Sequence, residues 1–468
     1  MQREKEFAKN SAILSIGTAV PKFTALITLP IITGCLTKAE YGTYDLITIL
    51  VSLFLPVATL QMQAAAFRFL IGVRGNREEQ TKIISCIVVF VLSVSVTSLL
   101  ILSFFLRWMQ VSTRLLILLY FLVDTLLICV RQIVRGLGKN FVYSVSALIN
   151  AVLELAGMFV LLSVRRDGLN GAVLALLGSQ TVSLLYLLIS EKIYSFIDLR
   201  TVSAGEIKKL LSYSWPMVPN ALSSWVMRAS DRLILSWFMG VEATAIYAAA
   251  NKLPMMFHLV QNTFTLAWQE SAAVSVNDRD SGEYYGKMFD SVFHFFAGAM
   301  GLLIAFTPIT FRLLIRGDYG ESYNHMPILY IAELFGAVSA YLGGIYVAHM
   351  KSRQIGVTTM IAAAINFLIN ILFVKKIGIY AASLSTLISY LWLAVYRMIN
   401  IQKIQRIKFN YPRICGLTLL LCGMSALCFL RLTSVDLFNM AFSVALAVFL
   451  NRNILKAIGK FAWSKIRQ

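Results

Sequence analysis

Long apolar stretches separated by short polar segments fill almost the whole chain. A helix that spans a lipid bilayer needs about 20 largely apolar residues, and a window of that length finds fourteen such stretches. The predicted spans cover residues 11–34, 44–67, 83–106, 115–134, 141–164, 171–189, 213–238, 245–274, 288–315, 326–350, 355–374, 379–399, 414–430 and 437–450. No connecting segment is long enough to form a soluble domain. The pattern predicts an all-α, multi-pass membrane protein.

Composition supports this interpretation. Of the 468 residues, 58% are hydrophobic and 14% are charged. In soluble proteins, about 45–50% of the residues are apolar and about 25% are charged. The six cysteines form no Cys-x-x-Cys pair, and only four histidines are present, so we expect no metal site and no disulfide framework. The chain also lacks a Gly-x-x-x-x-Gly-Lys-Ser/Thr loop for ATP. We therefore expect a protein that is not an enzyme and carries no cofactor.

The net charge of +19 would suggest nucleic acid binding in a soluble protein. In a membrane protein, the distribution of these charges first indicates how the chain is oriented across the membrane. Cytoplasmic loops of membrane proteins retain Lys and Arg. With the N-terminus inside, 28 of the 42 Lys and Arg residues, Arg131 and Arg397 among them, fall in inner segments and 10 in outer ones. We therefore predict that both termini are cytoplasmic, and we expect no nucleic acid partner. Arg131 and Arg397 lie at span ends, whereas the remaining four cations lie well inside spans: Lys22, Arg228, Arg232 and Lys252.

Two weak internal echoes predict a repeat. Residues 164–172 close the fifth span and open the sixth, and residues 374–382 do the same 210 positions later. Repeated helical bundles are common in transporters. We predict an N-terminal six-helix lobe over residues 1–200, a C-terminal six-helix lobe over 205–410, and a terminal helix pair with a basic cytoplasmic tail over 411–468.

Polar residues recur at helical spacing in three of the predicted spans, which would place them on one face of each helix. The stripes are Ser15, Thr18, Lys22 and Thr33; Asn220, Ser224, Arg228, Asp231 and Arg232; and Asn251, His258, Asn262, Thr265 and Gln269. A charge at the centre of a span costs about 2.5–3.5 kcal/mol, so the stripes predict a shared hydrated interior. Its four cations would favour an anion such as a pyrophosphate. Alternatively, Arg228 and Asp231 form an internal ion pair, and Lys252 extends to the interface.

Three acids within spans are candidates for coupling transport to an energy source. They are Asp124, Glu154 and Glu333, any of which could take up a proton or a sodium ion. Pairing with a cation of the interior is the alternative for each, and His258 is more simply a hydrogen-bonded histidine than a proton relay. The membrane potential is a further source of energy.

Several segments together resemble a known family. They are Lys22 and Pro30 in the first span, the stretch 35–44, the stretch 213–219, Ser230-Asp231-Arg232, and Ile246-Tyr247-Ala248. The sequence resembles the bacterial polysaccharide (O-antigen type) flippases of the multidrug/oligosaccharidyl-lipid/polysaccharide exporter superfamily. The resemblance implies two six-helix lobes around a cavity in the bacterial inner membrane. It also implies alternating-access transport of a polyprenyl-pyrophosphate-linked oligosaccharide to the outer leaflet, with membrane lipids, a polysaccharide polymerase and a chain-length regulator as partners.

Two other functions stay open. The nearer is a cation-coupled multidrug exporter of the same superfamily, which would favour an acidic, aromatic cavity. The second is a membrane-embedded polysaccharide polymerase or glycosyltransferase, which would need a long outer loop or an acidic catalytic cluster. The four intramembrane cations and the short connections favour the flippase.

Overall fold

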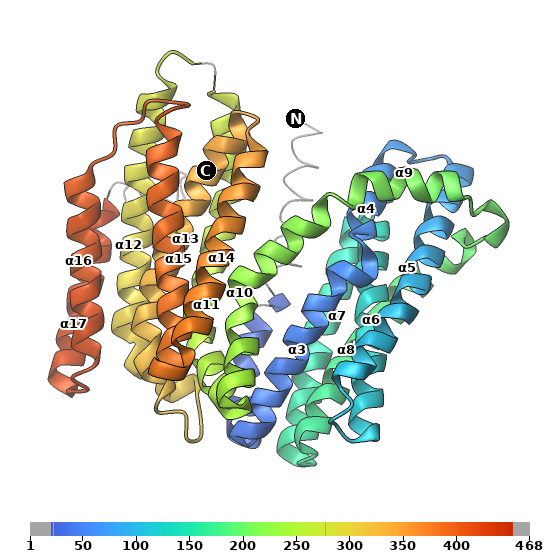
Figure 1. Ribbon diagram of the computed structural model, residues 1–468, viewed down its shortest axis with the longest axis horizontal. Coiled ribbons are helices and arrows are strands. Elements are labelled where there is room, and N and C mark those ends of the chain that lie inside the picture. Colours follow the sequence, from blue (N-terminus) through green and yellow to red (C-terminus); the bar gives the residue numbers. More distant parts are fainter. Residues whose placement is uncertain (1–19, 22, 277, 453–468) are drawn as a thin grey trace, which may run out of the picture. The chain divides into compact units, whose positions relative to one another are not determined.

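The computed structural model describes residues 20–452, except 22 and 277, and all regular elements in this part of the chain are helices (Figure 1). The chain divides into two compact units, with the boundary between Trp225 and Val226. The predicted all-α membrane fold is confirmed. Among the described residues, eleven helices are long and apolar enough to cross a membrane. The predicted lobe boundaries and the cytoplasmic position of both termini remain predictions.

From α2 onward, the described part of the first unit contains eight α-helices and the start of a ninth. Its elements are α2 (Leu29–Cys35), α3 (Lys38–Thr59), α4 (Met62–Gly72), α5 (Arg77–Phe105), α6 (Val111–Gly136), α7 (Asn140–Met158) with its π-helical end η1 (Phe159–Val164), α8 (Gly168–Ser190), the short 3-10 helices η2 (Ile193–Phe196) and η3 (Leu199–Thr201), and α9 (Ala204–Ser214). Helix α8 packs against α6 and α7, and α6 packs against α4 and α5. The core lies among α4, α5, α6 and α8.

The second predicted span, 44–67, is wrong as a single helix. Leu60 and Gln61 have φ values of 44° and 60°, in the left-handed region that non-glycine residues rarely adopt, and they separate α3 from α4. The Thr59 hydroxyl accepts the amide of Gln61 at 3.2 Å and donates to the carbonyl of Leu55 at 2.8 Å. A side chain that bonds the backbone locally competes with helix hydrogen bonds, which explains why an apolar run breaks here.

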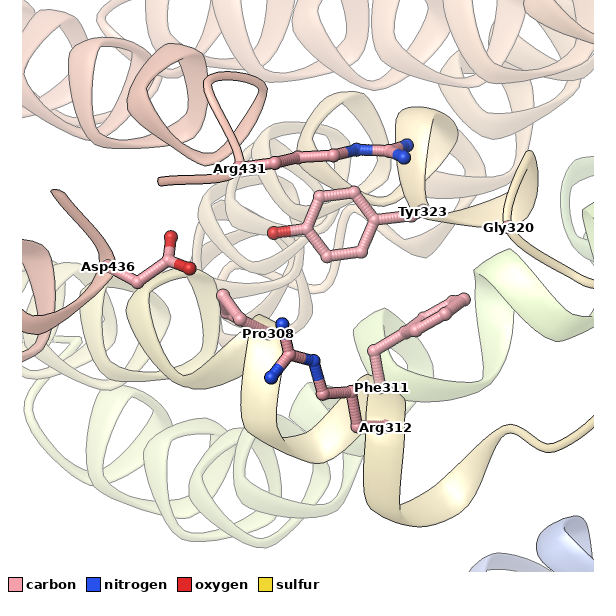
Figure 2. A pocket seen from close by; sticks show the side chains of 7 residues that line it. All are labelled: Pro308, Phe311, Arg312, Gly320, Tyr323, Arg431 and Asp436. Carbon is pink, nitrogen blue, oxygen red and sulfur yellow. The ribbon is translucent and has the colours of Figure 1, made fainter. Parts of the chain in front are cut away.

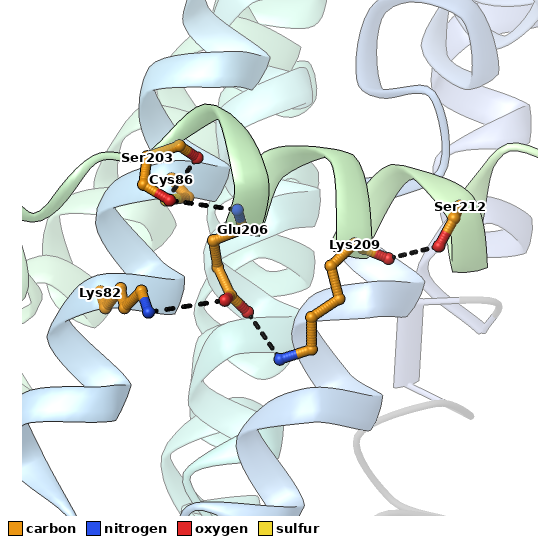
Figure 3. Close-up of polar contacts among 6 residues, drawn as sticks. All are labelled: Lys82, Cys86, Ser203, Glu206, Lys209 and Ser212. Atoms are coloured by element: carbon orange, nitrogen blue, oxygen red, sulfur yellow. Dashed lines mark hydrogen bonds and ion pairs between the residues drawn. The ribbon is translucent and has the colours of Figure 1, made fainter.

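Helix α9 packs against α4 and α5 in the first unit. Figure 3 shows how it is held. The Ser203 hydroxyl accepts the amide of Glu206 at 3.1 Å and so caps the helix, and Glu206 pairs with Lys82 at 3.7 Å and Lys209 at 3.0 Å. Helix α9 is amphipathic, and the face of it that contains Leu210 is buried in the core.

Replacing Ser203 by alanine is expected to destabilise the first turn of α9, because the Glu206 amide loses its cap. The expected cost is about 0.5–2 kcal/mol. Hydrogen exchange at the first-turn amides measures it, and Ser212→Ala is the matched control because its hydroxyl bonds only a mid-helix carbonyl, that of Lys209. Equal exchange rates in the two variants would contradict the assigned cap.

The second unit contains the larger part of α10 (Met217–Met239) and seven further helices. These are α11 (Val241–Val274), α12 (Ser281–Leu314), α13 (Ser322–Ala348), α14 (Ser352–Ile377), α15 (Ile379–Ile401), α16 (Tyr411–Cys428) and α17 (Thr433–Leu450). Helix α13 is central, since it packs against both α11 and α15, while α14 packs against α15. Helices α16 and α17 pack against α12 (Figure 1). Within its best 18-residue window, α13 is 83% buried, against 11% for α17.

The polar stripes predicted from the sequence fall on α10, on α11 and on the first predicted span, of which the structure describes the short apolar helix Phe23–Cys35. Polar residues inside membranes normally face protein or a water-filled space. These segments are therefore the ones beside which such a space is expected.

Candidate functional site

A small polar cavity inside the second unit brings together several of the predicted site residues. It lies among α10, α11, α13 and α15. Its lining residues are Met227, Arg228, Asp231, Tyr247, Asn251, Met255, His258, Glu333, Thr386 and Tyr390. About 20 Å³ is available to the centre of a water molecule, and one water needs about 10–15 Å³. The cavity therefore fits a single water or ion beside two acids, a histidine and an arginine.

One end of the cavity is an ion pair between two helices. His258 Nε2 on α11 lies 2.9 Å from Glu333 Oε2 on α13, and His258 Nδ1 lies 3.1 Å from Oε1 of Gln261. The Glu333 side chain is 7% exposed and that of His258 is 23% exposed. Each ring nitrogen of His258 therefore lies within hydrogen-bond distance of a side-chain oxygen, one on its own helix and one on α13.

The other end is the buried carboxylate of Asp231, which is only 3% exposed. Its Oδ1 accepts from Asn370 at 2.9 Å, and its Oδ2 accepts from Tyr247 at 3.0 Å and Thr386 at 2.8 Å. With its amide turned to satisfy its neighbours, Asn366 also donates to Oδ1 at 3.0 Å. Asp231 thus connects α10 to α11, α14 and α15 through neutral donors.

The predicted cations differ in how accessible they are. Arg228 lines the cavity and is exposed. Arg232 is buried, at 7% exposure, with Nη2 3.8 Å from the Met255 sulfur. Lys252 is half-buried on α11. Since a ligand needs access to the guanidinium, the structure favours Arg228 over Arg232 as a group that contacts substrate.

The other predicted binding residues lie on or outside this frame. Asn251 is buried and lines the cavity. Gln269 is half-buried and lies eleven residues beyond His258 on α11. This is a rise of about 16 Å along the helix, so Gln269 lies outside the cavity. Lys22 lies outside the described residues, as does the side chain of Asn262.

The remaining coupling candidates lie together in the first unit. Asp124 on α6 accepts from Gln180 Nε2 on α8 at 2.9 Å. The Tyr120 hydroxyl lies within electrostatic range of the carboxyl groups of Asp124 and Glu154. The Tyr44 hydroxyl also lies within electrostatic range of Glu154. The first unit therefore holds two half-buried acids, Asp124 and Glu154, near the buried rings of Tyr44 and Tyr120.

Sequence reasoning missed the neutral partners of Asp231. These are Tyr247, Asn366, Asn370 and Thr386. Asn366 and Asn370 are spaced four residues apart in the apolar α14 and share a face, a signal the sequence contained. Thr386 and Tyr247 carry no such signal, because threonine and tyrosine are ordinary residues in membrane helices.

Two arginines that were assigned to cytoplasmic segments prove to be cross-links between helices. Arg397 on α15, at 4% exposure, donates to the carbonyls of Ser339 at 2.9 Å and Ile355 at 3.2 Å, and to the hydroxyls of Thr358 and Thr359 at 2.9–3.1 Å. In the first unit, Arg131 on α6 donates to Ser146 and Ser183, on α7 and α8. Their charges therefore serve packing, in addition to the role in orientation that the sequence predicts.

Comparison with known proteins is consistent with this geometry. A sequence profile of the polysaccharide biosynthesis protein family matches residues 7–268. No significant match was found among curated protein sequences.

Solved structures share the fold at low sequence identity. The lipid II flippase MurJ in an inward closed conformation is 13% identical, with a TM-score of 0.71 over 96% of this chain and 99% of that one. An inward-facing multidrug resistance MATE transporter of the MOP superfamily is 14% identical, with a TM-score of 0.68 over 86% and 98%. A MOP superfamily transporter from Pyrococcus furiosus, described as having a binding pocket of reversed polarity, is 14% identical, with a TM-score of 0.57 over 84% and 95%.

The profile match covers more than half of the chain, and the structural matches cover nearly all of it. The resemblance predicted from the sequence is thereby confirmed at the level of family and fold. The chain belongs to the polysaccharide biosynthesis protein family and has the multi-pass transporter fold of the multidrug/oligosaccharidyl-lipid/polysaccharide exporter superfamily.

Proposed function

We propose that the protein is a flippase that moves a polyprenyl-pyrophosphate-linked oligosaccharide from the cytoplasmic to the outer leaflet, for the synthesis of a surface polysaccharide such as O-antigen, capsule or exopolysaccharide. The observation that carries the proposal is the match to the polysaccharide biosynthesis family. The fold shared with a lipid II flippase supports a lipid-linked substrate. The exposed Arg228 supports an anionic headgroup, because arginine binds phosphate oxygens in a bidentate manner. A polymerase and a chain-length regulator would act on the product.

Deletion of the gene tests the substrate class directly. Without the flippase, polyprenyl-linked oligosaccharide should accumulate on the cytoplasmic side, as shown by mass spectrometry of extracted membrane lipids. Restoring the wild-type gene should clear it. Normal surface polysaccharide and an unchanged lipid profile in the deletion strain would overturn the proposal.

The acidic and aromatic group of the first unit supports a second candidate, a cation-coupled multidrug exporter. Asp124 and Glu154 are half-buried acids near the buried ring of Tyr120, and a negative charge beside an aromatic ring favours a cation over an anion. The deletion strain separates the two functions. Increased drug sensitivity without accumulated lipid intermediate would favour the exporter.

For coupling, the pair of His258 and Glu333 supports a proton as the driving ion. Both groups line a cavity with room for one water, and the charge of each depends on protonation. A proton that arrives there would change the local field at Arg228, which lines the same cavity. In this way proton binding and headgroup binding would influence each other.

Replacing Glu333 by glutamine is expected to lower proton-driven flipping by about tenfold or more, because coupling free energies typically correspond to about 5- to 150-fold effects. The measurement uses the purified protein in proteoliposomes with an imposed pH gradient and lipid-linked oligosaccharide extracted from the deletion strain. Glu242→Gln, an exposed acid at the start of α11, is the matched control. An unchanged response of the Glu333→Gln variant to the gradient would exclude this pair as the proton site.

A further inference from the structure

A second, larger pocket lies at one end of the second unit, where α12 and α13 meet the connection between α16 and α17. Its volume is about 210 Å³, and its lining residues are Pro308, Phe311, Arg312, Gly320, Tyr323, Arg431 and Asp436 (Figure 2). The volume is far above the roughly 10–15 Å³ that one water needs. By the predicted orientation, this end faces the outer side of the membrane.

The pocket has two cationic groups and one anionic group. Arg431 is held in place, since its Nη2 donates to Asn324 Oδ1 at 2.9 Å and its guanidinium lies 5.3 Å from the centre of the Tyr323 ring. In Figure 2, Arg312 lies on the other side of Tyr323, and Asp436 lies toward the Tyr323 hydroxyl, away from the Arg431 guanidinium. Among the described contacts, neither Arg312 nor Asp436 takes part in an ion pair. The charges are therefore arranged around a space instead of neutralising one another.

The surroundings of the pocket are those of a surface that contacts lipid. Exposed apolar residues neighbour each of the three charged groups in the chain. They are Ile309 and Leu313 around Arg312, Leu430 and Leu432 around Arg431, and Leu437 and Phe438 after Asp436, with exposures of 50–68%. A water-soluble ligand would gain nothing from these side chains, whereas the acyl chains of a lipid would pack against them. A polar pocket bordered by exposed apolar helices is suited to a lipid headgroup.

We propose that this pocket binds a zwitterionic phospholipid headgroup of the phosphoethanolamine class. The phosphate is held between Arg312 and Arg431, because guanidinium groups form charge-assisted hydrogen bonds with phosphate oxygens. The primary ammonium is held by Asp436. The acyl chains of the lipid lie along α12 and α17. A purely anionic headgroup would satisfy the arginines but leave its negative charge near Asp436. The lipid would tie the weakly buried terminal helices to the rest of the unit.

Native mass spectrometry of the full-length protein in detergent tests the proposal. The probes are phosphatidylethanolamine, phosphatidylcholine and phosphatidylglycerol with identical acyl chains, supplied in equal amounts. We expect a preference of about 1.5- to fivefold for phosphatidylethanolamine, the range for a solvent-accessible charge contact. Methylation in phosphatidylcholine removes the ammonium hydrogens that Asp436 would accept.

Variants with opposite expected effects make the test specific. Asp436→Asn should abolish the preference over phosphatidylcholine and phosphatidylglycerol while binding of the latter is kept or increased. Arg312→Gln and Arg431→Gln should each reduce binding of all three lipids about 1.5- to fivefold. Lys376→Gln, an exposed cation at the end of α14, is the control and should change nothing. If an arginine variant does not fold, the isosteric Asp436→Asn variant still decides the question.

Three results would overturn the proposal. The first is an equal affinity of the wild-type protein for the three lipids. The second is a phosphatidylethanolamine preference that Asp436→Asn leaves unchanged. The third is displacement of the bound lipid by inorganic phosphate or by polyprenyl phosphate at the same concentration, which would identify a simple phosphate site.

Discussion

Replacing Asp231 by alanine is expected to abolish flipping and to destabilise the second unit by about 2–4 kcal/mol. The substitution removes the acceptor for Tyr247, Asn370 and Thr386 and leaves their polar groups buried without it. Each unsatisfied buried group costs about 1–3 kcal/mol, although water entering the space would offset part of the sum. The measurements are surface polysaccharide in a complemented deletion strain and the thermal unfolding temperature of the purified protein.

Two further variants separate the charge from the hydrogen bonds. Asp231→Asn keeps the shape of the side chain but replaces one acceptor oxygen by an NH2 donor. That donor would face another donor, on Asn370 or Tyr247, so both stability and flipping should fall. Thr386→Val removes one donor of several and should cost only about 0.5–1.5 kcal/mol. A fully stable and active Asp231→Ala protein would show that the cluster has no role in holding α10 against its neighbours.

Replacing Arg397 by methionine is expected to produce the second large effect, a loss of about 2–4 kcal/mol in the stability of the second unit. The guanidinium joins α15 to α13 and α14 through two carbonyls and two hydroxyls, and hydrogen bonds from a charged group contribute about 1.5–3 kcal/mol each before the cost of burying the charge is subtracted. The thermal unfolding temperature of the purified protein should fall accordingly.

The controls follow from the geometry of the guanidinium. Arg397→Lys should restore only part of the stability, because an ammonium has three donors and no planar fork. Lys403→Met removes a charge from an exposed position just beyond α15 and should be neutral. If Lys403→Met is as destabilising as Arg397→Met, the effect is one of net charge, and the proposed cross-link is wrong.

The hydrophobic pattern was sufficient to predict the helices. Most predicted spans agree with the observed helices to within a few residues, because twenty apolar residues in lipid can satisfy their backbone only as a helix. The exception at Leu60 and Gln61 has a local cause in the Thr59 hydroxyl. The apolarity of a window cannot show such a bond.

The candidate site was predicted in part. Arg228, Asp231, Asn251, His258 and Glu333 line one cavity, as the polar stripes and the intramembrane acid suggested. The sequence could not show that Glu333, 75 residues from His258, would be its partner, since that depends on how α11 packs against α13. Nor could it separate Arg228 from Arg232, which differ in burial although they lie one turn apart.

The two arginine cross-links have different consequences while the chain is being synthesised. Arg131 precedes its partners, and Ser183 follows it by 52 residues. At a synthesis rate of about 5–20 residues per second, Ser183 is added to the chain about 3–10 s after Arg131. Arg397 follows its partners Ser339 and Thr358 by 58 and 39 residues, so it enters a bundle that already contains its acceptors. Helix α6 of the first unit must therefore remain stable before all partners of Arg131 have been made, whereas Arg397 is made after the helices α13 and α14 that hold its acceptors.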